Sequence, residues 1–152
     1  MIQRIQTVYL ALAIIAIMVS VCFPLGYFDP EGMGFPYTLN SLCLADKDGV
    51  AQSYLPVTLM VLDTIAIVFA GVAIMGYKNH NRQISQCNFT ILVELLWVVN
   101  YGAYVLLLAP EATTFRPGFG AVLPLIAIIF TFLALKGVKA DRKLLRDTER
   151  IR

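Results

Sequence analysis

The chain has 152 residues, of which 59% are hydrophobic and 14% are charged, and its formal net charge is +2. This composition leaves too few polar side chains to cover a water-soluble core of this size, which argues against an ordinary soluble domain.

Four apolar runs dominate the sequence, at residues 5–26, 54–77, 89–109 and 119–138. A helix rises about 1.5 Å per residue, so about 20 residues cover the roughly 30 Å hydrocarbon core of a bilayer. The runs therefore predict an all-α fold, a four-helix transmembrane bundle that forms a single domain over residues 1–152. The first run is long enough to span a membrane and lacks the small-residue site of a cleaved signal sequence.

The basic residues predict the orientation of the spans. Ten of the 12 Lys and Arg residues flank the spans on one side, and only Lys47 and Arg116 lie on the other. Because Lys and Arg near the ends of spans are retained in the cytoplasm, both termini are expected to be cytoplasmic. The acidic residues on the opposite side are Asp29, Glu31, Asp46, Asp48 and Glu111.

Residues 27–53 form the longest connection, and we expect them outside the cytoplasm. Residues 37–44 are strand-like, residues 47–49 are typical of a turn, and residues 50–54 are expected to pair back. This pattern predicts a short β-hairpin-like loop that shields the outer helix ends. Contact with a partner or ligand is the alternative role of the loop.

Two acidic residues fall inside the predicted spans. Asp63 lies near the middle of the second span, where an Asp costs about 2.5–3.5 kcal/mol, so it must face the bundle interior or be protonated. Glu94 lies about five residues into the third span, roughly 7–8 Å deep, which allows partial hydration. Asn100 is near the depth of Asp63. Glu94, Trp97 and Tyr101 recur at three- and four-residue intervals, so they share a helix face. We therefore expect a hydrogen bond from Asp63 to Asn100 or Tyr101.

This candidate intramembrane polar site, Asp63, Glu94, Asn100 and Tyr101, has two interpretations. Hydrogen bonds that hold the helices together are the favoured one, at about 1 kcal/mol per bond. A proton or ion relay, or a substrate site, is the alternative because intramembrane acids are often functional. The sequence offers no basic partner and no chain of acids to complete a pathway.

The cysteines and the single histidine indicate no catalytic or metal site. There is no CxxC pair, and His80 has no second ligand nearby. Cys22 and Cys43 share the outer side, so a disulfide between them is geometrically possible, whereas Cys87 is on the cytoplasmic side. Motifs for phosphate binding, for a Ser-His-Asp triad and for zinc are absent. We expect no enzymatic activity, no metal and no cofactor.

The tail, residues 139–152, contains six basic and three acidic residues and is expected to continue the fourth helix as a cytoplasmic C-terminal extension. Its basic side chains are expected to contact lipid headgroups, with docking onto a cytoplasmic protein as the alternative. Interspersed acids and the lack of a known module argue against nucleic acid as a partner. The candidate contact residues are Lys139, Arg142, Lys143, Arg146 and Arg150.

Three groups of residues carry a resemblance to a known family. They are Met1-Ile2-Gln3-Arg4-Ile5-Gln6-Thr7-Val8-Tyr9-Leu10; Tyr77-Lys78-Asn79 with Arg82-Gln83-Ile84 and Cys87-Asn88; and Leu123-Pro124-Leu125-Ile126-Ala127 with Lys136-Gly137-Val138-Lys139-Ala140-Asp141, Leu144, Arg146, Arg150 and Arg152. Over the whole chain the sequence resembles the small four-pass inner-membrane family of Bacteroidota called domain of unknown function 4293. The resemblance implies a bacterial inner membrane and supplies no activity.

We therefore expect a structural or accessory subunit of a membrane assembly, whose partners are the lipid bilayer and other inner-membrane proteins. The alternative is a small carrier or a proton- or ion-coupled transporter that uses Asp63, Glu94 and Asn100.

Overall fold

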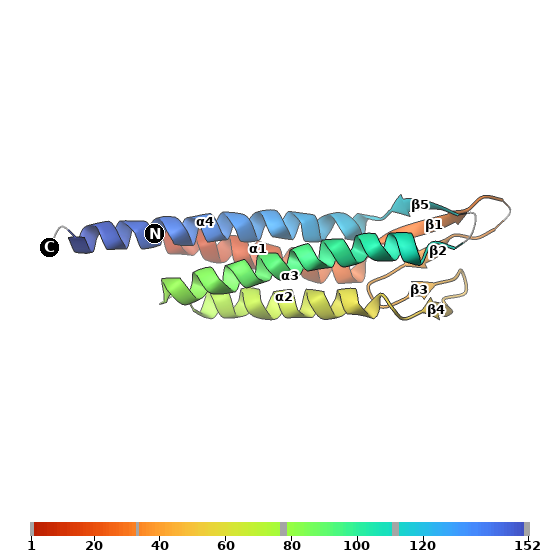
Figure 1. Cartoon of the computed structure of the whole chain (residues 1–152), viewed down its shortest axis with the longest axis horizontal. Helices are drawn as coiled ribbons and strands as arrows, with labels where there is room; N and C mark the ends of the chain where they lie inside the picture. The colour runs from red at the N-terminus through yellow and green to blue at the C-terminus, as the bar shows by residue number, and fades with distance from the viewer. Residues whose placement is uncertain (1, 33, 77–78, 111–112, 151–152) are drawn as a thin grey trace.

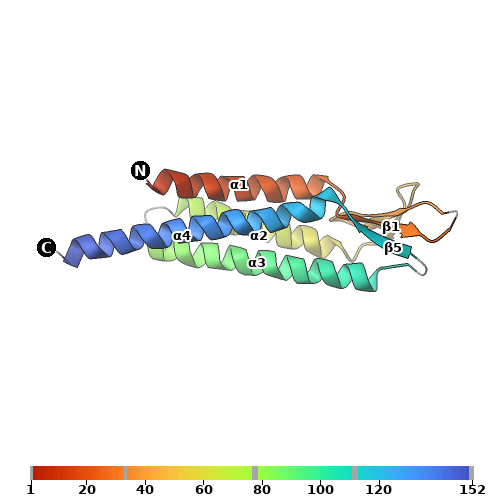
Figure 2. The same ribbon diagram turned by 90° about the horizontal axis from the view of Figure 1, so that it is seen from above.

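The structure, a computed structural model, describes residues 2–32, 34–76, 79–110 and 113–150, without the side chains of residues 2–4, 145 and 147–150. Its helices are α1 (Ile2–Cys22), α2 (Val57–Met75), α3 (His80–Leu107) and α4 (Val122–Arg150). They lie alongside one another in an elongated bundle, with the strands gathered at one end (Figure 1, Figure 2). α1 packs mainly against α4, and α2 packs mainly against α3.

Within the described residues, four helices are long and apolar enough to cross a membrane. The bundle buries less than half of each candidate span, so large apolar side chains remain exposed along all four helices. Such faces are favourable in lipid, and a helix satisfies its own backbone hydrogen bonds there. The prediction of four helices of membrane-spanning length is confirmed.

The fold is mixed α/β, so the prediction of an all-α bundle is wrong. The described residues form a five-stranded antiparallel sheet in the order β4-β3-β2-β1-β5. Its strands are β1 (Gly26–Pro30), β2 (Tyr37–Leu39), β3 (Leu44–Ala45), β4 (Ala51–Ser53) and β5 (Thr113–Pro117). Sequence periodicity misses strands of two to five residues, and β1 pairs with β5 across more than 80 residues of chain.

The connection between α1 and α2 contains more than the predicted hairpin. The turn at residues 46–49 is present: the Gly49 N–H donates to Asp46 O at 2.9 Å, and Gly49 adopts a φ of 74° that favours glycine. β3 and β4 pair across this turn. The segment predicted as one strand, residues 37–44, is instead divided into β2 and β3. The chain reverses between them, where the Asn40 N–H donates to Cys43 O at 2.9 Å.

The ends of three helices place the elements that follow. α1 ends at Cys22, and the chain turns through Pro24 into β1. α3 begins at His80, ahead of the apolar run that starts at residue 89. α4 continues without a break to Arg150 and extends past the other helices at the end opposite the sheet (Figure 1).

The sheet is attached to the bundle around Leu25. The Leu25 N–H donates to Leu39 O at 2.8 Å, and Leu25 O accepts hydrogen bonds from the Gly118 N–H and the Tyr101 hydroxyl group, both at 2.9 Å. Gly118 lies so close to the backbone of residues 24–26 that a Cβ at this position would overlap it. Bonds from β2, from α3 and from the segment after β5 thus meet at one residue.

An apolar cluster fills the junction between sheet and helices. Its buried members on the sheet side are Leu25, Phe28, Leu39 and Leu44, and its buried members on the helices are Leu59 and Trp97. Phe28 is fully buried, and its ring centroid lies 5.1 Å from that of Phe115 on β5. The rest of the bundle is lined largely by alanine, which lets helices approach closely. The sheet and the bundle therefore share one core.

We expect Gly118→Ala to destabilise the protein by about 1–3 kcal/mol, because the added methyl group would overlap the backbone beside Leu25. Gly102→Ala is the matched control. Gly102 is exposed on α3 with no neighbouring atom where a Cβ would be, and alanine is the better helix former. Chemical unfolding in detergent measures both variants. Equal stability of the two would contradict the close packing at Leu25.

Candidate functional site

The carboxyl groups of Asp63 and Glu94 lie together inside the bundle. Asp63 is on α2 and Glu94 is on α3, and only 3% and 2% of their surfaces are exposed. The two groups are close enough to interact electrostatically. Because α3 begins at His80, Glu94 lies near the middle of this helix and is packed in the interior, away from a hydrated helix end.

Thr131 of α4 and Trp97 of α3 complete this buried polar cluster. The Thr131 hydroxyl group lies 3.2 Å from Glu94 Oε1, to which it can donate, and 2.9 Å from Ala127 O. The Trp97 indole lies beside Asp63, but its Nε1 is outside hydrogen-bond geometry. Asp63 Oδ2 and Glu94 Oε2 are likewise buried without a hydrogen-bond partner among the described residues.

The hydrogen bonding of the cluster is compatible with more than one protonation state. The single hydroxyl proton of Thr131 cannot serve both Ala127 O and Glu94 Oε1 fully. When Glu94 is protonated, its own O–H can donate to Thr131 while Thr131 donates to Ala127. Two neighbouring carboxylates would repel each other, and Asp63 Oδ2 and Glu94 Oε2 have no donor among the described residues. The cluster is therefore able to hold protons between α2, α3 and α4.

The other two residues of the predicted polar site lie elsewhere. Tyr101 stacks on Trp97 with ring centroids 5.3 Å apart, but its hydroxyl group donates to Leu25 O at the junction. Asn100 is partly exposed and lies on a different face of α3 from Glu94, since the two are six residues apart and each residue turns the helix by about 100°. Of the predicted site residues, the structure brings Asp63 within electrostatic range of Glu94 and leaves Asn100 and Tyr101 outside the cluster.

Sequence reasoning did not select Thr131. Its position could have indicated a buried polar contact, because Thr131 is the one polar residue between Val122 and Leu135 in an otherwise apolar helix. Trp97 was visible only as a member of the same helix face as Glu94 and Tyr101.

The cysteines do not add to the site. Cys22, Cys43 and Cys87 are all free, so the disulfide that geometry allowed between Cys22 and Cys43 is not formed. In the part of the chain that the structure describes, no group of three or more His, Cys, Asp or Glu side chains is arranged to hold a metal ion.

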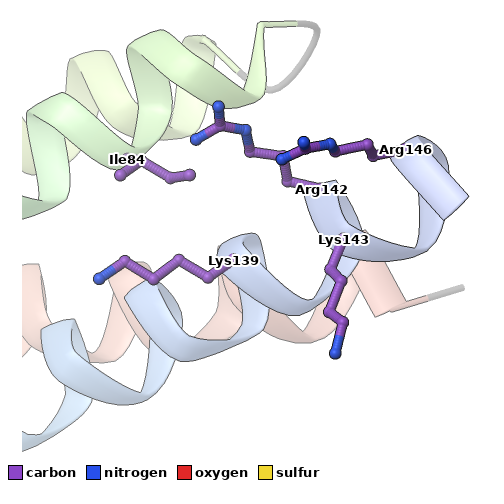
Figure 3. A pocket seen from close by; sticks show the side chains of 5 residues that line it. All are labelled: Ile84, Lys139, Arg142, Lys143 and Arg146. Carbon is purple, nitrogen blue, oxygen red and sulfur yellow. The ribbon is translucent and has the colours of Figure 1, made fainter.

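The basic tail forms a second candidate site, at the end of the bundle opposite the sheet. A pocket of about 290 Å³ is lined by Ile84 of α3 and by Lys139, Arg142, Lys143 and Arg146 of α4. Figure 3 shows Arg142 and Arg146 reaching towards α3, whereas Lys143 points away from them. The side chain of Arg150 lies outside the described part of the chain.

We expect Thr131→Val to cost about 1 kcal/mol of stability, because it preserves the shape of the side chain but leaves Glu94 Oε1 without its hydroxyl partner. Thr64→Val is the matched control: Thr64 is exposed on α2, and its hydroxyl group donates to Met60 O of its own helix at 2.8 Å. Thermal unfolding in detergent compares the two. An equal loss of stability in Thr64→Val and Thr131→Val would contradict a stabilising role for the buried hydrogen bond between Thr131 and Glu94.

Comparison with known proteins assigns the chain to a family. No curated protein matches the sequence. A family model does match, over residues 2–151, which is nearly the whole chain and includes the motifs around residues 77–88 and 123–141. The match confirms the resemblance seen in the sequence and adds no activity to it. The chain belongs to the family described as Domain of unknown function (DUF4293).

Proposed function

We propose that this chain is a four-pass protein of the bacterial inner membrane, with both termini in the cytoplasm, and that it serves as a structural or accessory subunit of a membrane assembly. The observation that carries the proposal is the shared core of the sheet and the bundle. This core holds a folded sheet firmly on the outer ends of the helices. A folded platform of this kind suits a subunit that makes contacts outside the membrane.

The distribution of charge supports the proposed orientation. α1 begins and α4 ends at the end opposite the sheet, where most of the basic residues lie (Figure 1). The two basic residues on the sheet side are engaged locally. The Lys47 ammonium group lies 3.4 Å from the centroid of the Phe35 ring, and Arg116 Nε lies 3.3 Å from Asp29 Oδ2. An excess of Lys and Arg on one side favours that side as cytoplasmic.

The orientation is tested with reporter fusions in a bacterial host. A green fluorescent protein fused after Arg152 is expected to fluoresce, because it would remain in the cytoplasm. Alkaline phosphatase inserted at the exposed turn next to Gly49 is expected to be active, because it would reach the oxidising outer side. The reverse pattern of the two activities would overturn the orientation.

The accessory role is tested by purification of the tagged chain from its native membrane in a mild detergent. We expect a partner in stoichiometric amount, absent when an unrelated four-pass protein is purified at the same expression level. Recovery of the chain alone, as a monomer or as a homo-oligomer, would contradict the accessory role.

A second candidate function, a proton-coupled carrier, is favoured by one observation. Asp63 and Glu94 interact electrostatically, and their Oδ2 and Oε2 atoms are buried without hydrogen-bond partners among the described residues. Asp63→Asn distinguishes the two functions, with Asp48→Asn in the exposed outer turn as its control. If the chain is an accessory subunit, Asp63→Asn should leave the purified complex intact. Liposomes that contain either the wild-type chain or the variant should then show no proton flux. Proton flux through the wild-type chain that is lost only in Asp63→Asn would establish the carrier instead.

A further inference from the structure

The last part of α4 is held in a defined rotation against α1. Asp141 is almost completely buried and accepts a hydrogen bond from Gln6 Nε2. One turn earlier, Gly137 makes room for the same Gln6 side chain, since a Cβ at this position would meet it. With Asp141 turned towards α1, Arg142 and Arg146 are directed towards α3 (Figure 3).

The pocket on the α3 side concentrates positive charge. Four of its lining residues are cationic, and of these Arg142 and Arg146 reach towards α3 while Lys143 points away from them (Figure 3). Arg142 and Arg146 are four residues apart on one helix, a spacing at which like charges repel. A guanidinium group binds phosphate through two parallel hydrogen bonds, so an anion with a phosphate group relieves this repulsion most effectively.

The position of the pocket favours a lipid over a soluble phosphate. The apolar run of α4 ends at Val138, and the pocket begins at the next residue, Lys139. From Lys139 to Arg146 the helix advances about 10 Å, which crosses from the edge of the hydrocarbon core into the headgroup layer. Ile84 adds an apolar wall on α3 against which an acyl chain can pack.

We infer that this pocket binds an anionic phospholipid, whose phosphate is held by the guanidinium groups of Arg142 and Arg146 while its acyl chain lies along α3 beside Ile84. The inference rests on the proposed function only in placing this end of the bundle at the headgroup layer. Bound in this way, the lipid would link α3 to the extension of α4 at the cytoplasmic surface.

The test measures lipid binding by the full chain, purified in a non-ionic detergent, by native mass spectrometry. The probes are phosphatidylglycerol, phosphatidylcholine and inorganic phosphate. We expect phosphatidylglycerol to bind at least about tenfold more tightly than either other probe, since phosphatidylcholine has no net charge and inorganic phosphate has no acyl chain to pack beside Ile84. Arg142→Gln with Arg146→Gln is expected to weaken phosphatidylglycerol binding by about tenfold or more.

The matched control is Arg82→Gln with Lys136→Gln, which removes the same charge from exposed positions that do not line the pocket. It is expected to bind phosphatidylglycerol within about twofold of the wild type. Equal losses in the two double variants would overturn the inference, because net charge alone would then explain binding. Equal affinity for inorganic phosphate and phosphatidylglycerol would overturn the choice of a lipid.

A charge-conserving variant keeps the inference testable if the glutamine variant does not fold. Arg142→Lys with Arg146→Lys preserves the charge but removes the planar guanidinium groups, so we expect about threefold weaker binding of phosphatidylglycerol. Unchanged affinity would contradict the proposed contact. Binding in detergent depends neither on the orientation of the termini nor on a partner protein. Failure of this test therefore leaves the proposed function standing, and failure of the fusion or purification tests leaves the lipid result standing.

Discussion

The backbone of Leu25 is the point on which the rest of the architecture depends. Its N–H is bonded to β2, and its carbonyl oxygen accepts from both the Gly118 N–H and the Tyr101 hydroxyl group. Hydrogen bonds of this kind need close approach, and glycine at position 118 permits it. Beneath these bonds, Phe28 and Trp97 belong to one buried cluster. The helices consequently end in a sheet that is part of their own core, and the sheet is more than a loop lying over them.

The same packing determines where polar groups can lie inside the bundle. α2 and α3 approach closely along small residues, and this brings Asp63 beside Trp97 and Glu94. Thr131 reaches the pair from α4. The hydrogen bond between Thr131 and Glu94 links α4 to α3 inside the bundle, whereas Asp63 Oδ2 of α2 has no hydrogen-bond partner among the described residues. A structural role for the cluster fits an apolar core that continues from the bundle into the sheet.

The features of the fold that depend on residues near one another in the sequence could be predicted, and those that depend on long-range contacts could not. The apolar runs predicted four helices, and three- and four-residue spacing put Glu94, Trp97 and Tyr101 on one face of α3. The sheet was missed because β5 lies in a connection of about ten residues and becomes a strand only by pairing with β1, a long-range contact without a local pattern. Asp63 and Glu94 were grouped from the sequence, but Glu94 was placed near a hydrated helix end. The first turns of α3, from His80, are polar, so a hydropathy pattern starts the helix too late.

The shared core of sheet and bundle is the central claim, and hydrogen exchange of the detergent-purified full chain tests it most directly. The account predicts that backbone amides paired between β1 and β5 exchange about as slowly as amides in the middle of α3, because both open only when the common core opens. Exchange of β1 and β5 within seconds, while α3 remains protected, would contradict the account and would reduce the sheet to a loosely attached lid.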